Sequence, residues 1–450
     1  MMLGLGRQLV IRSSAVATRR FKLTRLVSSS STASGPVDNQ HHAGDIIANN
    51  PEPQEVQKNQ PDQPFTELVR HFVNPQDFYG VLARNGFDFF CGVPDSLLKD
   101  FCSYVEENVP ADRHVITANE GNAIALASGY HLATGKAAVV YLQNSGLGNC
   151  VNPLMSLATP SVYSIPMLLL VGWRGEPGKL DEPQHQVQGS CTPLLLDSLG
   201  IPYQTLPDYI EGAEKAVLAA RDYVNTVGGP WVLLVRRQCF YKFKSKYVQN
   251  THPLTREEVC ENIVASLSPS DVVVSTTGML SRELFEYRAR NKQGHHRDFL
   301  TVGSMGHASS IAMGIAMGKP NRQIYCLDGD GACLMHMGTM GVAGTTGLEN
   351  FRHILVNNGA HDSVGGQPTA GTNWDRLSFG QIARGCGYKT ILDPVSSAEE
   401  IKAAVHKLRS VPAPAFLEIR CKKGNRIDLG RPTRTPQENK LDFMHFLRSE

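Results

Sequence analysis

The chain has 450 residues, of which 41% are hydrophobic and 19% charged, and its formal net charge is +2. This composition is typical of a globular protein with a large core, and so small a net charge gives no reason to expect nucleic acid as a partner. No run approaches the roughly 20 apolar residues of a membrane-spanning helix, so no membrane partner is expected either. The ten cysteines are scattered from Cys91 to Cys421 without a CxxC pair, which argues against a disulfide framework or a zinc site.

The first 35 residues have a different composition from the rest. Their basic residues lie among Ser, small and apolar residues, and no acidic residue occurs before Asp38. Basic, Ser-rich and acid-poor segments are typical of transit peptides, so we predict mitochondrial import; the alternative is a disordered basic tail on a cytoplasmic protein. Residues 36–65 are rich in Asn, Gln and Pro, which predicts a disordered linker.

Between residues 66 and 240, apolar runs alternate with helical patterns. The runs Ala137–Gln143, Pro166–Val171 and Trp231–Val235 predict buried strands, and the spacing of apolar residues in Glu120–Leu132 predicts a helix. Strands that alternate with helices favour a parallel sheet. We therefore predict a first α/β domain over residues 66–240.

A second series of the same kind covers residues 255–430. Its predicted strands are Val272–Ser275, Ile324–Leu327, Ile354–Val356 and Phe416–Ile419, and its predicted helices include Ala308–Gly318 and Ser397–Leu408. The prediction is an α/β protein with two doubly wound parallel-sheet domains and no central third domain. Residues 431–450 are predicted to form a C-terminal tail.

Polar and glycine residues follow two of the predicted strands in the second series. Asp330 lies between Gly329 and Gly331 after the first strand, and Asn357 and Asn358 follow the next. Ligands of open parallel sheets lie beyond the carboxyl ends of the strands, and oxygen atoms are the ligands that Mg²⁺ prefers. Gly-Asp-Gly is also a good turn sequence, so this motif alone is weak evidence for a metal site. The two motifs together predict a metal site more strongly.

A glutamate, Glu120, opens the predicted helix Glu120–Leu132 after a strand-like segment. In the first turn of a helix, such a residue also has a structural role, because it favours the helix dipole and completes caps. Upstream of the GDG motif, Gly303-Ser304-Met305-Gly306 precedes the helix of small residues at Ala308–Gly318. A tightly packed helix start would account for that segment by itself.

Taken together, these motifs resemble those of the thiamine diphosphate enzymes, whose signature is GDG followed by NN. The resemblance implies that the side chains of Asp330 and Asn358 and the backbone carbonyl of Ala360 bind a divalent metal such as Mg²⁺, with Asn357 the alternative to Asn358. It implies that Glu120 hydrogen-bonds the aminopyrimidine ring of thiamine diphosphate and that Met305 supports the bent cofactor. The residues implied to bind the cofactor are Glu120, Gly303, Met305, Gly329, Asp330, Gly331 and Asn358.

Within that family, the sequence from about residue 75 to about residue 425 resembles the phosphonopyruvate decarboxylases. The stretches that carry this resemblance are 92–96 (GVPDS), 143–149 (QNSGLGN), 172–175 (GWRG), 181–185 (DEPQH) and 357–368 (NNGAHDSVGGQP). The resemblance implies decarboxylation of 3-phosphonopyruvate to phosphonoacetaldehyde and carbon dioxide, a step in phosphonate biosynthesis towards 2-aminoethylphosphonate. It also implies a homodimer or larger assembly, with the active site shared between subunits.

Several residues of these stretches are candidates for catalysis or substrate binding. Candidate acid–base groups are Asp95, His185 and His361, besides Glu120. Candidate substrate-binding residues are Ser145, Asn149 and Arg174, since a guanidinium matches phosphonate oxygens. Each has an ordinary alternative: Asp95 as the cap of a helix at Leu97–Val105, each histidine as a packed side chain, and Arg174 as a solvated loop charge.

Three other functions remain as alternatives. A sulfopyruvate decarboxylase would act on a sulfonate in place of the phosphonate, and relatives of that enzyme share a similar QNSGLGN stretch. A 2-oxo acid carboligase is less compatible with the missing central domain. An inactive regulatory subunit is disfavoured because both Glu120 and Asp330 are present.

Overall fold

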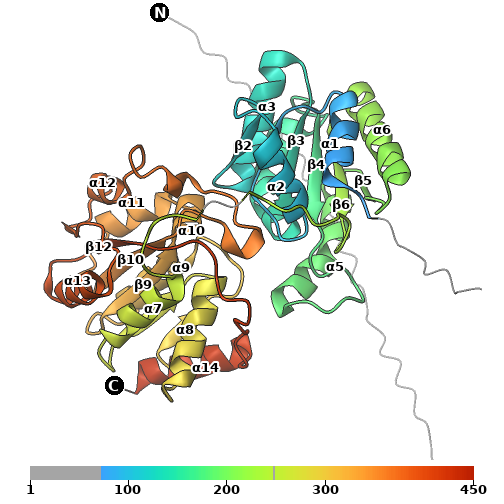
Figure 1. The fold of residues 1–450 in the computed structure, drawn as a ribbon. Helices are drawn as coiled ribbons and strands as arrows, with labels where there is room; N and C mark the ends of the chain where they lie inside the picture. The colour runs from blue at the N-terminus through green and yellow to red at the C-terminus, as the bar shows by residue number, and fades with distance from the viewer. Residues whose placement is uncertain (1–71, 247–248, 450) are drawn as a thin grey trace, which may run out of the picture. The chain divides into compact units, whose positions relative to one another are not determined.

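The computed structural model describes residues 72–246 and 249–449 of the chain. The predicted transit peptide, 1–35, and the predicted linker, 36–65, lie outside the described residues. Within them, two six-stranded sheets follow one another along the chain, and every strand pairing in both sheets is parallel (Figure 1). The predicted fold class, two parallel-sheet α/β units without a third sheet between them, is confirmed.

The first sheet has the strand order β2-β1-β3-β4-β6-β5. Its strands are β1 (Phe90–Gly92), β2 (His114–Ile116), β3 (Ala138–Gln143), β4 (Met167–Gly172), β5 (Tyr203–Thr205) and β6 (Pro230–Val235). Its helices are α1 (Pro75–Arg84), α2 (Lys99–Asn108), α3 (Glu120–Thr134), α4 (Leu147–Pro153), α5 (Pro183–Ser198) and α6 (Ile210–Thr226).

Alternate residues of the central strands enter two separate apolar cores, one on each face of the first sheet. Val139 and Tyr141 of β3 pack with α1, α2 and α6, whereas Val140 and Leu142 pack with α3 and α4. This alternation follows from the two-residue period of a strand. Because both faces are covered, the central strands are apolar along their whole length, which is why the sequence shows them as continuous runs.

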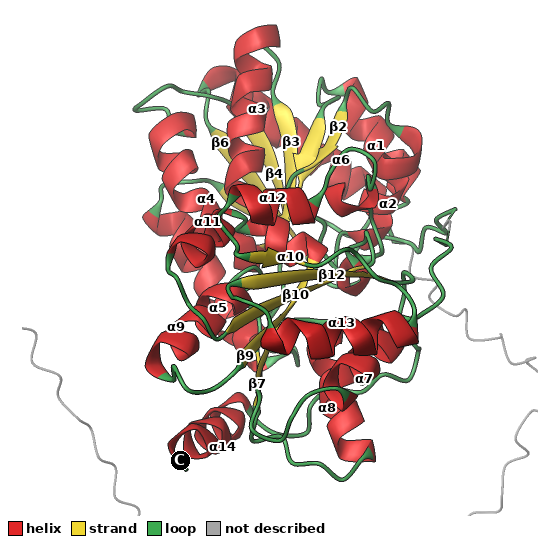
Figure 2. Ribbon diagram, turned by 90° about the vertical axis from the view of Figure 1, so that its left-hand side faces the viewer, coloured by secondary structure: helices red, strands yellow, loops and turns green. Residues whose placement is uncertain are grey.

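The second sheet has the order β11-β12-β10-β9-β7-β8. Its strands are β7 (Val272–Ser275), β8 (Asp298–Leu300), β9 (Ile324–Gly329), β10 (Phe351–Asn357), β11 (Thr390–Ile391) and β12 (Ala415–Arg420). Its helices are α7 (Arg256–Ala265), α8 (Met279–Arg290), α9 (Ala308–Gly318), α10 (Asp330–Met335), α11 (Gly338–Thr345), α12 (Phe379–Gly385), α13 (Ala398–Ser410) and α14 (Pro436–Arg448). The helices of this sheet also pack in two layers, with α7, α8 and α13 on one core and α9, α11 and α12 on the other (Figure 2).

The predicted C-terminal tail at 431–450 contains the helix α14. Thr435 begins it with a capping box, since its hydroxyl accepts from the backbone N–H of Glu438 and its own N–H donates to that glutamate. Phe443 then packs in the core of the second sheet, and Asn439 donates to the carbonyl of Asp298 over 2.9 Å. Phe446 and Leu447 pack against the same core, so the segment folds by burying the apolar face of a short helix.

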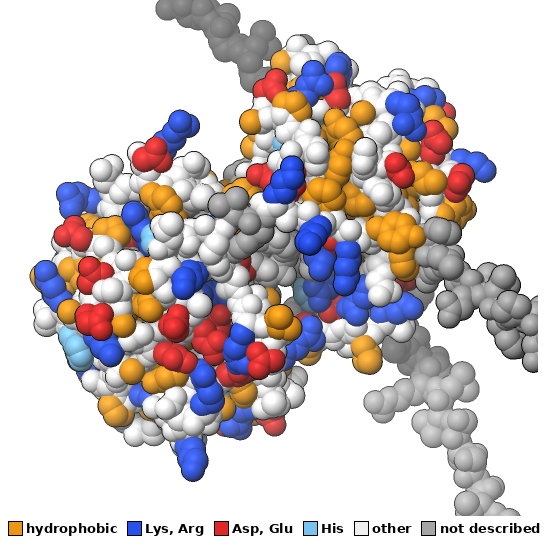
Figure 3. Space-filling view, viewed as in Figure 1, with side chains coloured by type: hydrophobic (Ala, Val, Ile, Leu, Met, Phe, Trp, Pro, Cys, Tyr) orange, Lys and Arg blue, Asp and Glu red, His pale blue; other side chains and the backbone are white. Residues whose placement is uncertain are grey.

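Among the short strands at the sheet edges, β2 matches the strand-like segment expected before Glu120, whereas β5, β8 and β11 were not predicted. β2, β5, β8 and β11 have three residues or fewer, and β2 and β5 have no fully buried residue. On the face shown in Figure 3, basic and acidic side chains are interspersed, in keeping with the small net charge. Among the described residues, no helix is long and apolar enough to cross a membrane.

Candidate active site

The GDG and NN motifs meet at the carboxyl edge of the second sheet. β9 ends at Gly329 and α10 begins at Asp330, and the neighbouring strand β10 ends at Asn357. Because the strands are parallel, their carboxyl ends share one edge, which is where open α/β sheets bind ligands. The tertiary structure thus places side by side two motifs that are far apart in the sequence.

Asp330 supplies a buried carboxylate at this edge. Its side chain accepts a hydrogen bond from the hydroxyl of Thr369, and the residue is only 2% exposed. Burial raises the pKa of Asp330 to about 7, although the hydrogen bond from Thr369 lowers it. A cation beside this carboxylate would offset the cost of burying its charge. Thr369 was not predicted, since nothing in the sequence links it to the GDG motif.

Asn357 and Asn358 have different neighbours. The side chain of Asn357 is fully buried and donates to Glu418 over 3.0 Å, whereas Asn358 lines a pocket together with Asp330 and Ala360. The carboxylate of Asp330, the amide of Asn358 and the carbonyl of Ala360 offer oxygen atoms only, which fits a hard divalent cation. The arrangement favours Asn358 over Asn357 as the metal ligand, and this assignment stays a prediction.

Glycines keep the surroundings of Asp330 clear of side chains. A Cβ atom on Gly331 would lie 3.0 Å from the ring of His361 and 3.3 Å from the side chain of Met305. A Cβ atom on Gly371 would lie 3.0 Å from Oδ2 of Asp330. The predicted residues that line the pocket are Met305, Gly329, Asp330, Gly331, Asn358, Ala360 and His361. The residues present therefore fit a diphosphate approached closely by backbone, with a divalent cation.

The loop before α9 is shaped by residues in left-handed conformations. Gly303 and Ser304 have φ values of 67° and 48°, and the N–H of Gly303 donates to the hydroxyl of Thr277 over 3.0 Å. This bond ties the loop to the residues that follow β7 and leaves Met305 at the pocket. Gly303 itself does not line the pocket, so its predicted contact with the cofactor stays untested.

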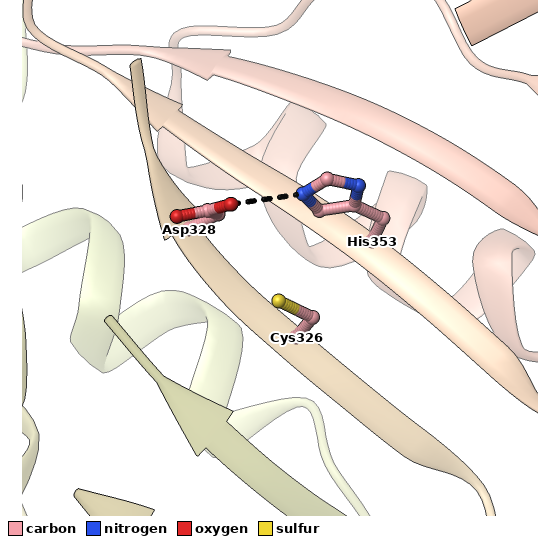
Figure 4. A group of neighbouring side chains, drawn as sticks. All are labelled: Cys326, Asp328 and His353. Carbon is pink, nitrogen blue, oxygen red and sulfur yellow. Dashed lines mark ion pairs between the residues drawn. The ribbon is translucent and has the colours of Figure 1, made fainter. Parts of the chain in front are cut away.

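Beneath this edge, Cys326, Asp328 and His353 form a fully buried group whose ligand-type atoms lie within 4.8 Å of one another (Figure 4). Nε2 of His353 lies 3.4 Å from Oδ2 of Asp328, and its Nδ1 lies 3.0 Å from the hydroxyl of Tyr388. Apolar side chains of β9, β10 and α12 enclose the group. We interpret it as a buried polar anchor for the end of β9. Sequence reasoning did not single out this group, because its residues lack metal-ligand spacing.

In the first sheet, Glu120 lies at the start of α3 but does not cap it. The cap is Asn119, whose side-chain oxygen accepts from the N–H of Gly121 over 2.8 Å. The carboxylate of Glu120 accepts instead from the side chain of Asn149 over 2.8 Å, and it packs against Gly146, where a Cβ atom would lie 2.4 Å from Oε1. The capping explanation for Glu120 is therefore excluded. Asn149, predicted to bind substrate, orients this carboxylate in the structure.

The two carboxyl oxygen atoms of Asp95 have different surroundings. Its Oδ1 accepts from the N–H groups of Leu97 and Leu98, so the carboxyl caps the turn that leads into α2. Its Oδ2 is buried without a hydrogen-bond partner, and burial raises the pKa of Asp95 to about 6. A carboxyl group with this pKa exchanges protons near neutrality, which suits an acid–base role. That role stays a prediction.

Asp95→Asn should stabilise the protein at high pH but not at low pH. The folded pKa of about 6 exceeds the ordinary value of 3.8, so between these values the native state holds a proton that the unfolded chain has lost. Stability therefore falls as pH rises from about 4 to about 6, and asparagine removes this loss. We expect a gain of up to about 3 kcal/mol in the free energy of unfolding at pH 8 and little change near pH 4.

Urea unfolding at the two pH values measures this difference. Asp222→Asn is a matched control, because the Asp222 side chain is 67% exposed in the same half of the chain. A gain of equal size at both pH values would show that ionisation of Asp95 is not its cause.

Arg174, the predicted phosphonate partner, is already paired. Its Nε donates to Oδ2 of Asp181 over 2.8 Å, its Nη2 pairs with Oδ1 of the same carboxylate, and its Nη1 donates to Ser96 over 2.9 Å. This pair holds the pKa of Asp181 below its usual range despite burial. A phosphonate would have to displace Asp181 to bind Arg174 in bidentate fashion, which weakens that prediction.

The remaining candidates are His185, His361 and Ser145. His185, on α5, is half-buried, and burial together with the charge of Arg174 lowers its pKa. Burial lowers the pKa of His361 to about 4, so its ring is neutral near pH 7. The hydroxyl of Ser145 is exposed and accepts from the side chain of Gln143 over 2.6 Å. Their catalytic and substrate-binding roles stay predictions.

Comparison with known proteins agrees with the site. Residues 76–194 match the N-terminal and residues 276–419 the C-terminal TPP binding domain of thiamine pyrophosphate enzymes. The chain therefore belongs to the thiamine pyrophosphate (thiamine diphosphate) enzyme family, as a decarboxylase that uses this cofactor with Mg²⁺.

Within the family, the chain is similar to the phosphonopyruvate decarboxylase of Streptomyces viridochromogenes, with 31% identity over 83% of this chain and 95% of the relative. The phosphonopyruvate decarboxylase of Streptomyces hygroscopicus is 30% identical over 83% of this chain and 94% of its own length. The sulfopyruvate decarboxylase of Methanosarcina acetivorans is 26% identical over 79% of this chain and 93% of its own length.

Proposed function

We propose that this enzyme decarboxylates 3-phosphonopyruvate to phosphonoacetaldehyde and carbon dioxide, a step towards 2-aminoethylphosphonate. The observation that carries the proposal is the 31% identity to a phosphonopyruvate decarboxylase over 95% of that relative's length. Two features support an active enzyme over an inactive subunit. Oxygen atoms suited to a metal ion are present at the second sheet, and the carboxylate of Glu120 is oriented by Asn149 and does not cap its helix.

The residues of this chain have separate tasks in that reaction. Asp330, Asn358 and Ala360 would hold the divalent cation and, through it, the diphosphate. Glu120, fixed by Asn149, would hold a proton at the aminopyrimidine nitrogen. Thiamine diphosphate, when bound, supplies the electron sink that lets a 2-oxo acid lose carbon dioxide. Asp95, with its pKa of about 6, is suited to giving a proton to the product near neutrality.

The substrate is tested by measuring carbon dioxide and aldehyde release from phosphonopyruvate, sulfopyruvate and pyruvate, each with and without thiamine diphosphate and Mg²⁺. We expect turnover that depends on the cofactor and has its highest kcat/KM with phosphonopyruvate. A higher kcat/KM with sulfopyruvate would keep the mechanism and assign the other substrate. Condensation products without net aldehyde release would favour a carboligase.

We further propose a homodimer or larger assembly with the active site shared between subunits. Support comes from the distribution of the site residues over two sheets, since Glu120 belongs to the first sheet and the metal ligands to the second. Sedimentation combined with activity at dilution tests this, and full activity in a monomer would contradict it. The acid-poor, basic N-terminus supports mitochondrial import, which imaging of the tagged full-length chain would test.

A further inference from the structure

The side-chain amide of Asn358 is held in one orientation. Its Nδ2 donates to Oδ2 of Asp362 over 2.6 Å, and its Oδ1 accepts from the N–H of Ala360 over 3.1 Å. The reverse orientation would set two oxygen atoms against each other and the amide nitrogen against an N–H donor. With its nitrogen committed to Asp362, Asn358 presents its oxygen as the atom left for a cation.

Asp362 is itself held by two further donors. Its Oδ2 also accepts from Nη1 of Arg256 over 2.6 Å and from the N–H of Gly424 over 2.9 Å, and its side chain is 5% exposed. A carboxylate this deeply buried is costly unless it is paired and hydrogen-bonded. Removal of the guanidinium would therefore free the Asp362 side chain to turn away, and this movement would release the amide of Asn358.

Arg256 is placed by the fold before any cation binds. It is the first residue of α7, which Thr255 and Glu258 cap, and its Nε and Nη2 each donate to Glu283 of α8 over 2.9 Å. The side chains of Arg256 and Glu283 are 8% and 2% exposed, and α7 lies beside α8 in the second sheet's helical layer (Figure 1). The planar guanidinium thus uses all three nitrogens, a pattern that lysine does not reproduce.

We propose that Arg256, fixed by Glu283, is a positioning residue that orients the metal-binding amide of Asn358 through Asp362. The chain of contacts joins α8, α7 and the loop after β10, so helix packing on one face of the sheet sets the geometry of the metal site. Arg256 therefore acts on cation affinity through Asp362 and Asn358, and its effect does not depend on which 2-oxo acid is the substrate.

The proposal is tested by titrating Mn²⁺ into full-length protein in the presence of thiamine diphosphate and without any 2-oxo acid. Free Mn²⁺ is measured by electron paramagnetic resonance. Arg256→Met keeps the apolar stem and removes the guanidinium. We expect Mn²⁺ affinity to fall about 10–100-fold, the usual effect of losing a group that orients a metal ligand. We also expect kcat to recover when Mg²⁺ is raised in proportion.

Arg290→Met is the matched control, because Arg290 lies on α8, pairs with Glu257 and Glu261, and is 52% exposed. We expect its Mn²⁺ affinity to equal that of the wild type. Unchanged Mn²⁺ affinity in Arg256→Met, with only a lower unfolding temperature, would assign Arg256 a purely structural role and overturn the proposal. If Arg256→Met does not fold, Asp362→Asn decides in its place: weaker Mn²⁺ binding supports the proposal, and wild-type binding contradicts it.

Discussion

Glu120→Gln should bind thiamine diphosphate and Mg²⁺ nearly as well as the wild type, yet lose most of its turnover. Glu120 is 6% exposed and its carboxylate is held by Asn149, and glutamine has nearly the same shape, so the surrounding packing should survive. The neutral amide cannot, however, hold and release a proton at the aminopyrimidine ring. We expect kcat to fall about 10²–10⁴-fold, the range of a lost general acid–base contribution.

Calorimetric titration with the cofactor and steady-state carbon dioxide release measure the two halves of this prediction. Glu349→Gln is a suitable control, because the Glu349 side chain is 84% exposed and pairs only loosely with Lys389, at 3.8 Å. It should behave like the wild type in both assays. Near-normal turnover in Glu120→Gln would remove Glu120 from the catalytic machinery, and loss of cofactor binding would give it a mainly structural role.

Asp330→Ala should show the opposite result: it should lose binding of thiamine diphosphate, and turnover should be lost as a consequence. Asp330 offers the only carboxylate among the three predicted metal ligands, so alanine leaves two neutral oxygen donors for a divalent cation. We expect Mg²⁺-dependent binding of thiamine diphosphate to weaken by more than about 100-fold, the upper end of what loss of a mere supporting group causes.

Calorimetry with thiamine diphosphate, at low and at high Mg²⁺, tests this expectation. The unfolding temperature without cofactor should not fall, because the substitution removes a buried carboxylate whose pKa is raised to about 7 by burial. Asp428→Ala, with a side chain that is 82% exposed, serves as the control. Unchanged, Mg²⁺-dependent binding in Asp330→Ala would show that the metal lies elsewhere.

The contrast between these two variants follows from their positions in the fold. Glu120 lies beside the first sheet and Asp330 at the edge of the second, and each packs closely against a glycine, Gly146 for Glu120 and Gly371 for Asp330. A larger residue at either glycine should therefore disturb the site without touching its charged groups.

The sequence alone determined the fold class, the family and the main site motifs. Strands buried on both faces, such as β4 and β10, are continuous apolar runs, and the glycines around Asp330 are needed wherever backbone meets a diphosphate. These signals are local, so they survive in a single sequence. Sequence reasoning placed Asp330, Asn358 and Met305 in one pocket for this reason, whereas it did not identify the helix α14 within the predicted C-terminal tail.

Only the tertiary structure decided which partners these residues have. Asn149 holds Glu120, Asp181 already occupies Arg174, and Thr369 binds Asp330, although none of these pairs is adjacent in the sequence. The link from Arg256 to Asn358 through Asp362 likewise joins residues about a hundred positions apart. Such contacts depend on how helices pack on a sheet and on which buried charges must be paired. Neither property can be predicted from a local sequence pattern.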